Sequence, residues 1–149
     1  MADQAQILIV EGRFYEGIVD ALVEGVVAVL HAEGISYERL AVPGAFEIPA
    51  AIAMAEASDE PFEGYIALGC VIRGQTSHYD YVCQESARKL MDLATERGLP
   101  LGYGILTVEH EAQAWERARM SERNKGSEVA RTCLRMMELQ ERFLGSNDD

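Results

Sequence analysis

The chain passes from an apolar run into a helical pattern through one segment with two glycines, Gly69-Cys70-Val71-Ile72-Arg73-Gly74-Gln75-Thr76-Ser77-His78-Tyr79-Asp80-Tyr81-Val82. Good helix formers recur at helical spacing from Tyr81 to Arg97. A helix that begins after such a turn presents unpaired backbone N–H groups and a partial positive charge, which favour an anion. Histidine is the side chain that exchanges protons near neutral pH. The segment therefore predicts an anion site with His78 at its mouth.

Further along the chain, apolar runs alternate with helical periodicities. Strands are expected at 7–10, 37–42, 65–71 and 101–108, and helices at 16–33, 45–57, 79–97, 111–120 and 125–144. This alternation indicates a parallel sheet with right-handed crossovers and helices on both faces. We expect an α/β fold, a three-layer α/β/α sandwich with a four-stranded parallel sheet in flavodoxin-like order.

Residues that are unusual for a core gather where the expected strands end. They are Gly12-Arg13-Phe14, Pro43-Gly44-Ala45-Phe46-Glu47, the segment 69–78 and Thr107-Val108-Glu109-His110. Ligands of such folds bind in the crevice beyond the carboxyl ends of the strands. Four such strand ends predict a binding site at this edge of the sheet.

Length and composition indicate one folded domain over residues 1–149. The chain is 48% hydrophobic and long enough for a core, which argues against disorder. Its formal net charge of −12 disfavours nucleic acid and anionic membranes as partners. An anionic small substrate would therefore need a local group of cations. Candidates for it are Arg73, Arg117, Arg123 and Lys125.

The cysteines and the termini carry no signal of metal binding or export. Cys70, Cys83 and Cys133 stand far apart, without metal-ligand spacing, and we expect reduced thiols in apolar surroundings and no metal. The first apolar run follows no basic region and is too short to span a bilayer. We expect a cytoplasmic protein without membrane contact.

The last expected helix has an apolar face wider than one contact with the sheet needs. This face predicts a subunit interface, and the alternative is a covered helix in a monomer.

Two strings, Val42-Pro43-Gly44-Ala45-Phe46-Glu47-Ile48-Pro49 and the segment 69–82, resemble the lumazine synthase family of riboflavin biosynthesis. Gly12-Arg13-Phe14, Gly104-Ile105-Leu106-Thr107, Gln113-Ala114-Trp115-Glu116-Arg117-Ala118 and Asn124-Lys125-Gly126 are similar to further motifs of that family, in the same order. The resemblance runs from about Ile7 to Leu139. It implies condensation of 5-amino-6-(D-ribitylamino)uracil with 3,4-dihydroxy-2-butanone 4-phosphate to 6,7-dimethyl-8-ribityllumazine, with release of phosphate and water. It also implies no cofactor.

The same resemblance implies roles for individual residues. His78 is expected to be catalytic, and Phe14 to stack on the pyrimidine ring. The aminouracil and its ribityl chain would also meet Ala45, Phe46, Glu47, Cys70, Val71, Ile72 and Tyr103, of which Tyr103 comes from the adjacent subunit. The phosphate would meet Gln75, Thr76, Arg117 and Lys125. Several residues have a plainer structural alternative. His78 would cap a helix, Phe14 would be a core residue, and Glu47 an acid in the first turn of a helix. Arg117 would be a surface charge, Tyr103 a packed strand residue, and Arg73 structural.

The family forms pentamers with sites between subunits, and in some members a closed shell. We expect a pentamer or a pair of pentamers here. Tyr15, Cys70 and Tyr103 depart from the residues common in the family and bear on the shape of the pocket. Two other functions stay open: a binding protein that retains a flavin or lumazine, and a shell-forming scaffold. A general nucleotide-binding domain is disfavoured because the glycines of 69–74 match neither of the common phosphate-loop patterns.

Overall fold

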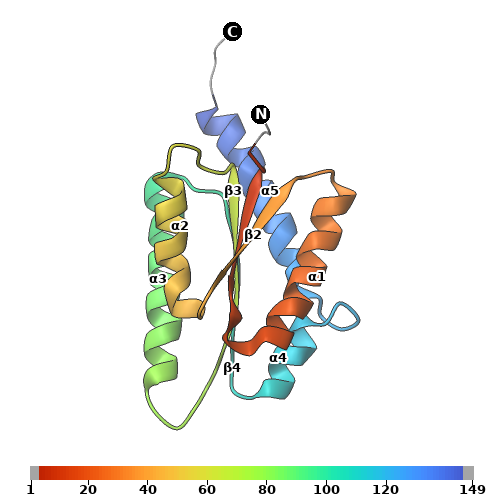
Figure 1. Ribbon diagram of the computed structural model, residues 1–149, viewed down its shortest axis with the longest axis vertical. Helices are drawn as coiled ribbons and strands as arrows, with labels where there is room; N and C mark the ends of the chain where they lie inside the picture. Colours follow the sequence, from red (N-terminus) through yellow and green to blue (C-terminus); the bar gives the residue numbers. More distant parts are fainter. Residues whose placement is uncertain (1–3, 146–149) are drawn as a thin grey trace.

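Four parallel strands form the middle layer of the structure, a computed structural model that describes residues 4–145 (Figure 1). They are β1 (Ile7–Gly12), β2 (Tyr37–Val42), β3 (Gly64–Ile72) and β4 (Leu101–Val108), in the order β2-β1-β3-β4. All three neighbouring pairs are parallel. The expected α/β class, the four-stranded parallel sheet and its flavodoxin-like order are thereby confirmed.

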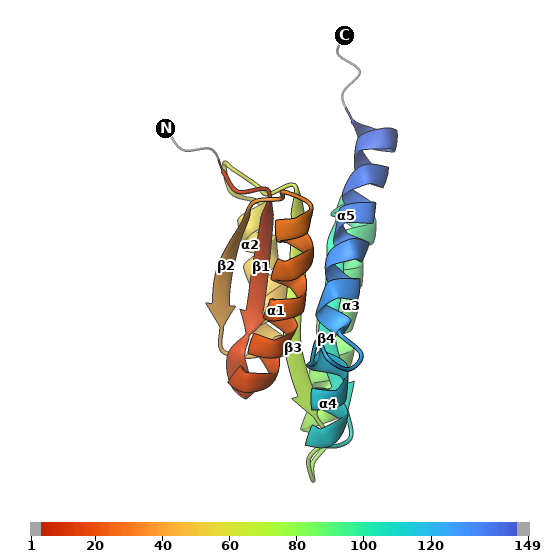
Figure 2. The ribbon, with the colours of Figure 1, turned by 90° about the vertical axis from the view of Figure 1, so that its right-hand side faces the viewer.

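Helices cover both faces of this sheet (Figures 1 and 2). One face packs against α1 (Glu16–Ala32), α4 (Glu111–Ala118) and α5 (Lys125–Leu144), and the other against α2 (Ile48–Glu56) and α3 (His78–Arg97). There are also two short 3-10 turns. The first, η1 (Arg13–Tyr15), follows β1, and the second, η2 (Ala45–Glu47), precedes α2. Both lie at the carboxyl edge of the sheet.

The central strands are buried on both sides, which explains their continuous apolar sequences. In β3, Ile66 and Leu68 point into the cluster under α1 and α5, and Tyr65 and Ala67 into the cluster under α2 and α3. The edge strand β2 is largely exposed. The core therefore consists of two clusters separated by β1 and β3.

The element boundaries differ from the expected ones at a few places. β1 extends to Gly12 instead of ending at residue 10, because the charged Glu11 is buried there and paired with arginines. The expected helix at 45–57 is divided into η2 and α2, with Pro49 in the first turn of α2, where its missing N–H costs little. The helix expected at 111–120 ends at Ala118.

The end of β1 touches the turn before α2 through backbone atoms. A Cβ on Gly12 would lie 2.7 Å from the carbonyl carbon of Gly44 and 2.8 Å from the nitrogen of Ala45. Real Cβ atoms do not come so close, so this contact requires glycine at position 12. It brings η1 and η2 together on one side of the carboxyl edge.

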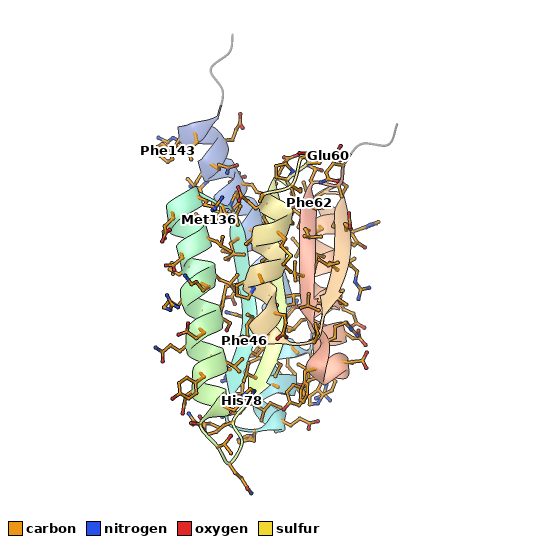
Figure 3. All side chains as sticks on the ribbon, turned by 60° about the vertical axis from the view of Figure 1, so that its left-hand side comes forward. Phe46, Glu60, Phe62, His78, Met136 and Phe143 are labelled. Carbon is orange, nitrogen blue, oxygen red and sulfur yellow. The ribbon has the colours of Figure 1, made fainter. Side chains whose placement is uncertain are left out.

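The apolar face of α5 is only partly used inside the chain. Val129, Ala130 and Cys133 are buried in the core, whereas Met136, Phe143 and Leu144 are exposed. Figure 3 shows Met136 and Phe143 on this helix. The subunit interface expected on this helix stays a prediction.

Candidate active site

A hollow of about 440 Å³ opens beyond the carboxyl ends of β1 and β3. Its walls come from η1, the segment from Pro43 to η2, the end of β3 and the start of α3. We call it the histidine hollow. It is lined by Phe14, Tyr15, Pro43, Gly44, Ala45, Phe46, Glu47, Cys70, Val71, Ile72, His78 and Val82. The structure thus places Phe14, Glu47 and His78 around one shared space.

Aromatic rings from η1 and η2 line the histidine hollow. Phe14 is 73% exposed and Phe46 56% exposed, although both are large apolar residues. The ring of Tyr15 meets that of Phe14 edge to face, with centroids 4.9 Å apart. Phe46 lies in η2, the turn before α2. Figure 3 shows His78 at the start of the neighbouring helix α3. Exposed rings beside a carboxylate suit a flat, polar, aromatic ligand.

The turn that carries Phe14 is anchored by a buried carboxylate. Glu11 is 2% exposed, and it binds Arg13 Nη1 through Oε1 at 2.7 Å and Arg39 Nε through Oε2 at 2.6 Å. Arg13 also binds Asp20 of α1 at 2.7 Å. Sequence reasoning gave Glu11 no role, because a single acid at the end of a strand resembles a surface residue.

The three residues at the end of β3 alternate between the two faces of the sheet. Cys70 and Ile72 point toward the α1 side, and Val71 toward the α2 and α3 side. Burial raises the pKa of the Cys70 thiol to about 12, so the group is neutral at physiological pH. A neutral, buried thiol is a poor nucleophile, and contact of Cys70 with a ligand through its backbone stays a prediction.

His78 is the first residue of α3, and Arg73 fixes the loop that leads to it. Arg73 Nε binds Glu109 Oε1 at 2.9 Å, and its guanidinium carbon lies 4.3 Å from the centre of the Tyr79 ring. Arg73 Nη1 also lies 3.4 Å from Asp80 Oδ1. These contacts connect the ends of β3 and β4 with the first turn of α3. They support the structural alternative for Arg73.

The backbone amides at the start of α3 are partly in use. The N–H of His78 donates to Thr76 Oγ1 at 3.3 Å, and the N–H of Asp80 donates to the Ser77 carbonyl at 3.0 Å. Gln75 and Thr76 are exposed, and neither lines the histidine hollow. Their expected contact with a phosphate stays a prediction.

A second hollow, of about 350 Å³, lies along β4 and reaches α4 and the start of α5. We call it the cation hollow. Its lining consists of Tyr103, Ile105, Leu106, Thr107, Val108, Arg117, Arg123, Lys125 and Glu128. Three residues expected to bind substrate lie here, namely Tyr103, Arg117 and Lys125. Burial raises the pKa of Tyr103.

The two hollows share no lining residue. They adjoin across the sheet, because Cys70, Val71 and Ile72 pair with Leu106, Thr107 and Val108. Within one chain, the imidazole and the exposed aromatic rings line one hollow, and the arginines and lysine expected at the same ligand line the other. Arg123 was one of the candidate cations for an anionic substrate, whereas Glu128 was not expected in a site. Arg123 lies in no motif, and only its place between α4 and α5 brings it to this hollow.

Neither a metal site nor a membrane segment emerges from residues 4–145. This part of the chain has no group of three His, Cys, Asp or Glu residues placed to hold a metal ion. None of its helices has the length and apolar character needed to cross a membrane. The three thiols are free.

Fold and hollows together define a class of protein, a flavodoxin-like α/β sandwich with hollows at the carboxyl ends of its strands. Comparison with known proteins narrows this class. The family model of 6,7-dimethyl-8-ribityllumazine synthase matches residues 4–141. The chain belongs to this family, and it is an enzyme of the transferase class.

Curated relatives agree with the family match over nearly the whole chain. A 6,7-dimethyl-8-ribityllumazine synthase of Nitrobacter hamburgensis is 55% identical over 143 residues, which cover 93% of this chain and 88% of the relative. One of Bartonella tribocorum is 52% identical and covers 96% and 95%. One of Rhizobium meliloti, named synthase 1, is 54% identical and covers 92% of each.

Proposed function

We propose that this enzyme condenses 5-amino-6-(D-ribitylamino)uracil with 3,4-dihydroxy-2-butanone 4-phosphate to 6,7-dimethyl-8-ribityllumazine in riboflavin biosynthesis. One observation carries the proposal beyond family membership: Phe14, Glu47 and His78 line the same hollow. An aromatic ring, a carboxylate and an imidazole are the groups that a flat, hydroxylated, amine-bearing substrate needs.

In this proposal the histidine hollow binds the aminouracil. Phe14 stacks on the pyrimidine ring, and the Glu47 carboxylate accepts hydrogen bonds from ring N–H groups or ribityl hydroxyls. Ala45, Phe46, Cys70, Val71 and Ile72 complete the walls, the last three through their backbone groups. Orientation of two substrates against each other supplies much of the acceleration.

His78 moves the protons that the condensation requires. The amine of the aminouracil attacks the ketone and forms an imine as water leaves, phosphate is then eliminated, and ring closure releases water again. Each step transfers a proton to or from nitrogen, carbon or oxygen. A positioned imidazole contributes ~10²–10⁴-fold to such transfers. The exposed place of His78 at the start of α3 leaves its ring accessible from the hollow.

The phosphate meets Arg117 and Lys125, with Gln75 and Thr76 at the turn before α3. Tyr103, Arg117 and Lys125 do not line the histidine hollow, and in this proposal a second copy of the chain brings them to a ligand bound there. We therefore propose a homo-oligomer, a pentamer or a multiple of pentamers, with each site between neighbouring subunits. A cytoplasmic location stays a prediction from the sequence.

The direct test mixes the purified protein with both substrates and follows lumazine absorbance together with phosphate release. Equal amounts of both products support the reaction. Tight binding of lumazine without turnover would favour the alternative of a binding protein. Mass measurement in solution tests the assembly.

A complementation experiment tests whether the site is shared between subunits. His78→Ala and Arg117→Ala chains are purified separately, unfolded, mixed and refolded, with each variant refolded alone as a control. Activity above both controls is expected, since some boundaries in the mixture combine an intact histidine hollow with an intact cation hollow. No gain at any mixing ratio would contradict sites between subunits.

A further inference from the structure

We infer that Arg123 is a third phosphate-binding cation of the cation hollow, beside Arg117 and Lys125. This inference rests on the proposed function and adds a residue to the same site. It is carried by the place of Arg123 in the lining, by the backbone that holds it there and by the charge balance around it.

The backbone of the turn between α4 and α5 fixes the position of Arg123. Its N–H donates to the carbonyl of Glu116 at 3.0 Å, and the N–H of Asn124 donates to the carbonyl of Arg119 at 3.0 Å. Asn124 adopts a left-handed conformation with φ 49° just before α5 begins. The turn therefore doubles back on the end of α4, and Arg123 faces the hollow that Arg117 also lines.

Glu116 lies between the two arginines without binding either of them closely. Its Oε1 is 3.6 Å from Arg117 Nη1, and its Oε2 is 3.6 Å from Arg123 Nε. Both separations exceed the normal range of N–H···O hydrogen bonds, about 2.7–3.2 Å. Arg117 Nη1 donates to the carbonyl of Gln113 at 3.1 Å, and the other donors of the two planar side chains face an incoming phosphate.

Charge balance decides whether the hollow attracts an anion at all. Arg117 and Lys125 are accompanied by two carboxylates, Glu116 and Glu128, the latter 3.0 Å from Lys125 Nζ. Those four charges cancel, and Arg123 brings the cluster to one net positive charge. The chain as a whole carries −12. Without Arg123, a phosphate dianion would enter a locally neutral cluster on an acidic protein.

Arg119, in the same turn, makes different contacts and provides a matched control. Its guanidinium carbon lies 4.7 Å from the centre of the Trp115 ring, and its Nη1 lies 3.3 Å from Glu122 Oε2. It lines another hollow, with Trp115 and residues of α1. Removal of its charge changes the net charge of the turn as much as removal of Arg123 does.

The test measures inorganic phosphate binding to the assembled protein by calorimetry, and KM for each substrate. Arg123→Gln is expected to weaken phosphate binding and to raise KM for the butanone phosphate by about five- to tenfold, the loss of one exposed charge-assisted contact. KM for the aminouracil is expected to stay within twofold of the wild type. Arg123→Lys keeps the charge and is expected to retain most of the affinity, and Arg119→Gln all of it.

The outcomes separate this inference from the proposed function. If Arg117→Gln weakens phosphate binding and Arg123→Gln does not, the inference is wrong and the proposed function stands. If neither change affects KM for the butanone phosphate, the phosphate role of the whole hollow is wrong. If Arg123→Gln alters folding, Arg123→Lys decides, since weak phosphate binding by a well-folded lysine variant at normal melting temperature would contradict a charge-based role.

Discussion

Glu11 and Arg39 form an ion pair across the first two strands, with Oε2 and Nε 2.6 Å apart and a second contact of 3.0 Å between Oε1 and Nη2. Arg39 lies opposite Ile9 in the parallel register, so its side chain is on the same face of the sheet as Glu11. A buried carboxylate needs such partners, because transfer of an unpaired charge out of water is costly.

Arg39→Ala should therefore destabilise the fold and disturb the turn that presents Phe14. Arg13 still pairs with Glu11 in the variant, and water can reach the vacated edge, so we expect a loss of about 1 kcal/mol in the free energy of unfolding. Urea unfolding measures it, and KM for the aminouracil is expected to rise in parallel. Arg88→Ala, which removes an exposed pair with Glu85 on α3, is the control and should change little. Equal effects of the two changes would contradict the role of burial.

His78→Ala should lower kcat by about 10²-fold while activity remains measurable. The reason is that orientation of the substrates survives when the proton-transferring group is lost. Stopped-flow absorbance of the lumazine measures the rate, and substrate binding is followed separately. Complete loss of turnover with both substrates still bound would show that the histidine carries more of the reaction than proton transfer.

Phe14→Ala should weaken aminouracil binding without affecting stability. At 73% exposure the ring contributes little to the core, whereas a stacked aromatic pair contributes about 0.5–1.5 kcal/mol, or about two- to twelvefold in affinity. Calorimetric titration with the aminouracil tests this, and thermal unfolding serves as the control. A large fall in melting temperature would show that Phe14 is a core residue instead.

Cys133 should make the protein less stable at alkaline pH. Burial raises the pKa of its thiol to about 12, an effect larger than that of the backbone hydrogen bonds with Tyr65 and Gly102, which lower it. Above the ordinary cysteine pKa the unfolded chain loses a proton that the folded chain retains, so the free energy of unfolding falls as pH rises from about 9 toward 12.

The measurement compares wild type with Cys133→Ala by urea unfolding at pH 8 and pH 10. The variant is less stable at both values because of the cavity, but its loss between them should be smaller by about 1 kcal/mol. Identical losses would mean that the thiol ionises in the folded protein.

Much of the architecture follows from local sequence signals. The apolar run of β3 and the glycines that follow it define a buried strand and the turn into α3, and these alone place His78 at the carboxyl edge. The end of β1 was harder to predict, because Glu11 is compatible with a strand interior only through Arg39, a residue distant in sequence. Burial of a charge depends on tertiary partners that no local pattern records.

In the candidate site, too, one part follows from local sequence and another depends on tertiary contacts. Phe14, Glu47 and His78 each follow a different strand, and the parallel topology brings them to one hollow. Gln75 and Thr76 are adjacent to His78 in the sequence but face elsewhere, because a loop does not fix the direction of its side chains by periodicity. Arg123 was a candidate cation that no motif supported, since its relation to Arg117 depends on how the turn before Asn124 folds back.

Separation of the histidine hollow from the cation hollow has a genetic consequence. If each active site takes residues from two neighbouring subunits, a substitution in one chain inactivates a site that also contains wild-type residues of the neighbouring chain. Co-expression of one allele defective in the histidine hollow and another defective in the cation hollow would nevertheless restore growth without riboflavin. Some interfaces of the mixed oligomer would combine an intact histidine hollow with an intact cation hollow. Two alleles that are defective in the same hollow would not restore growth.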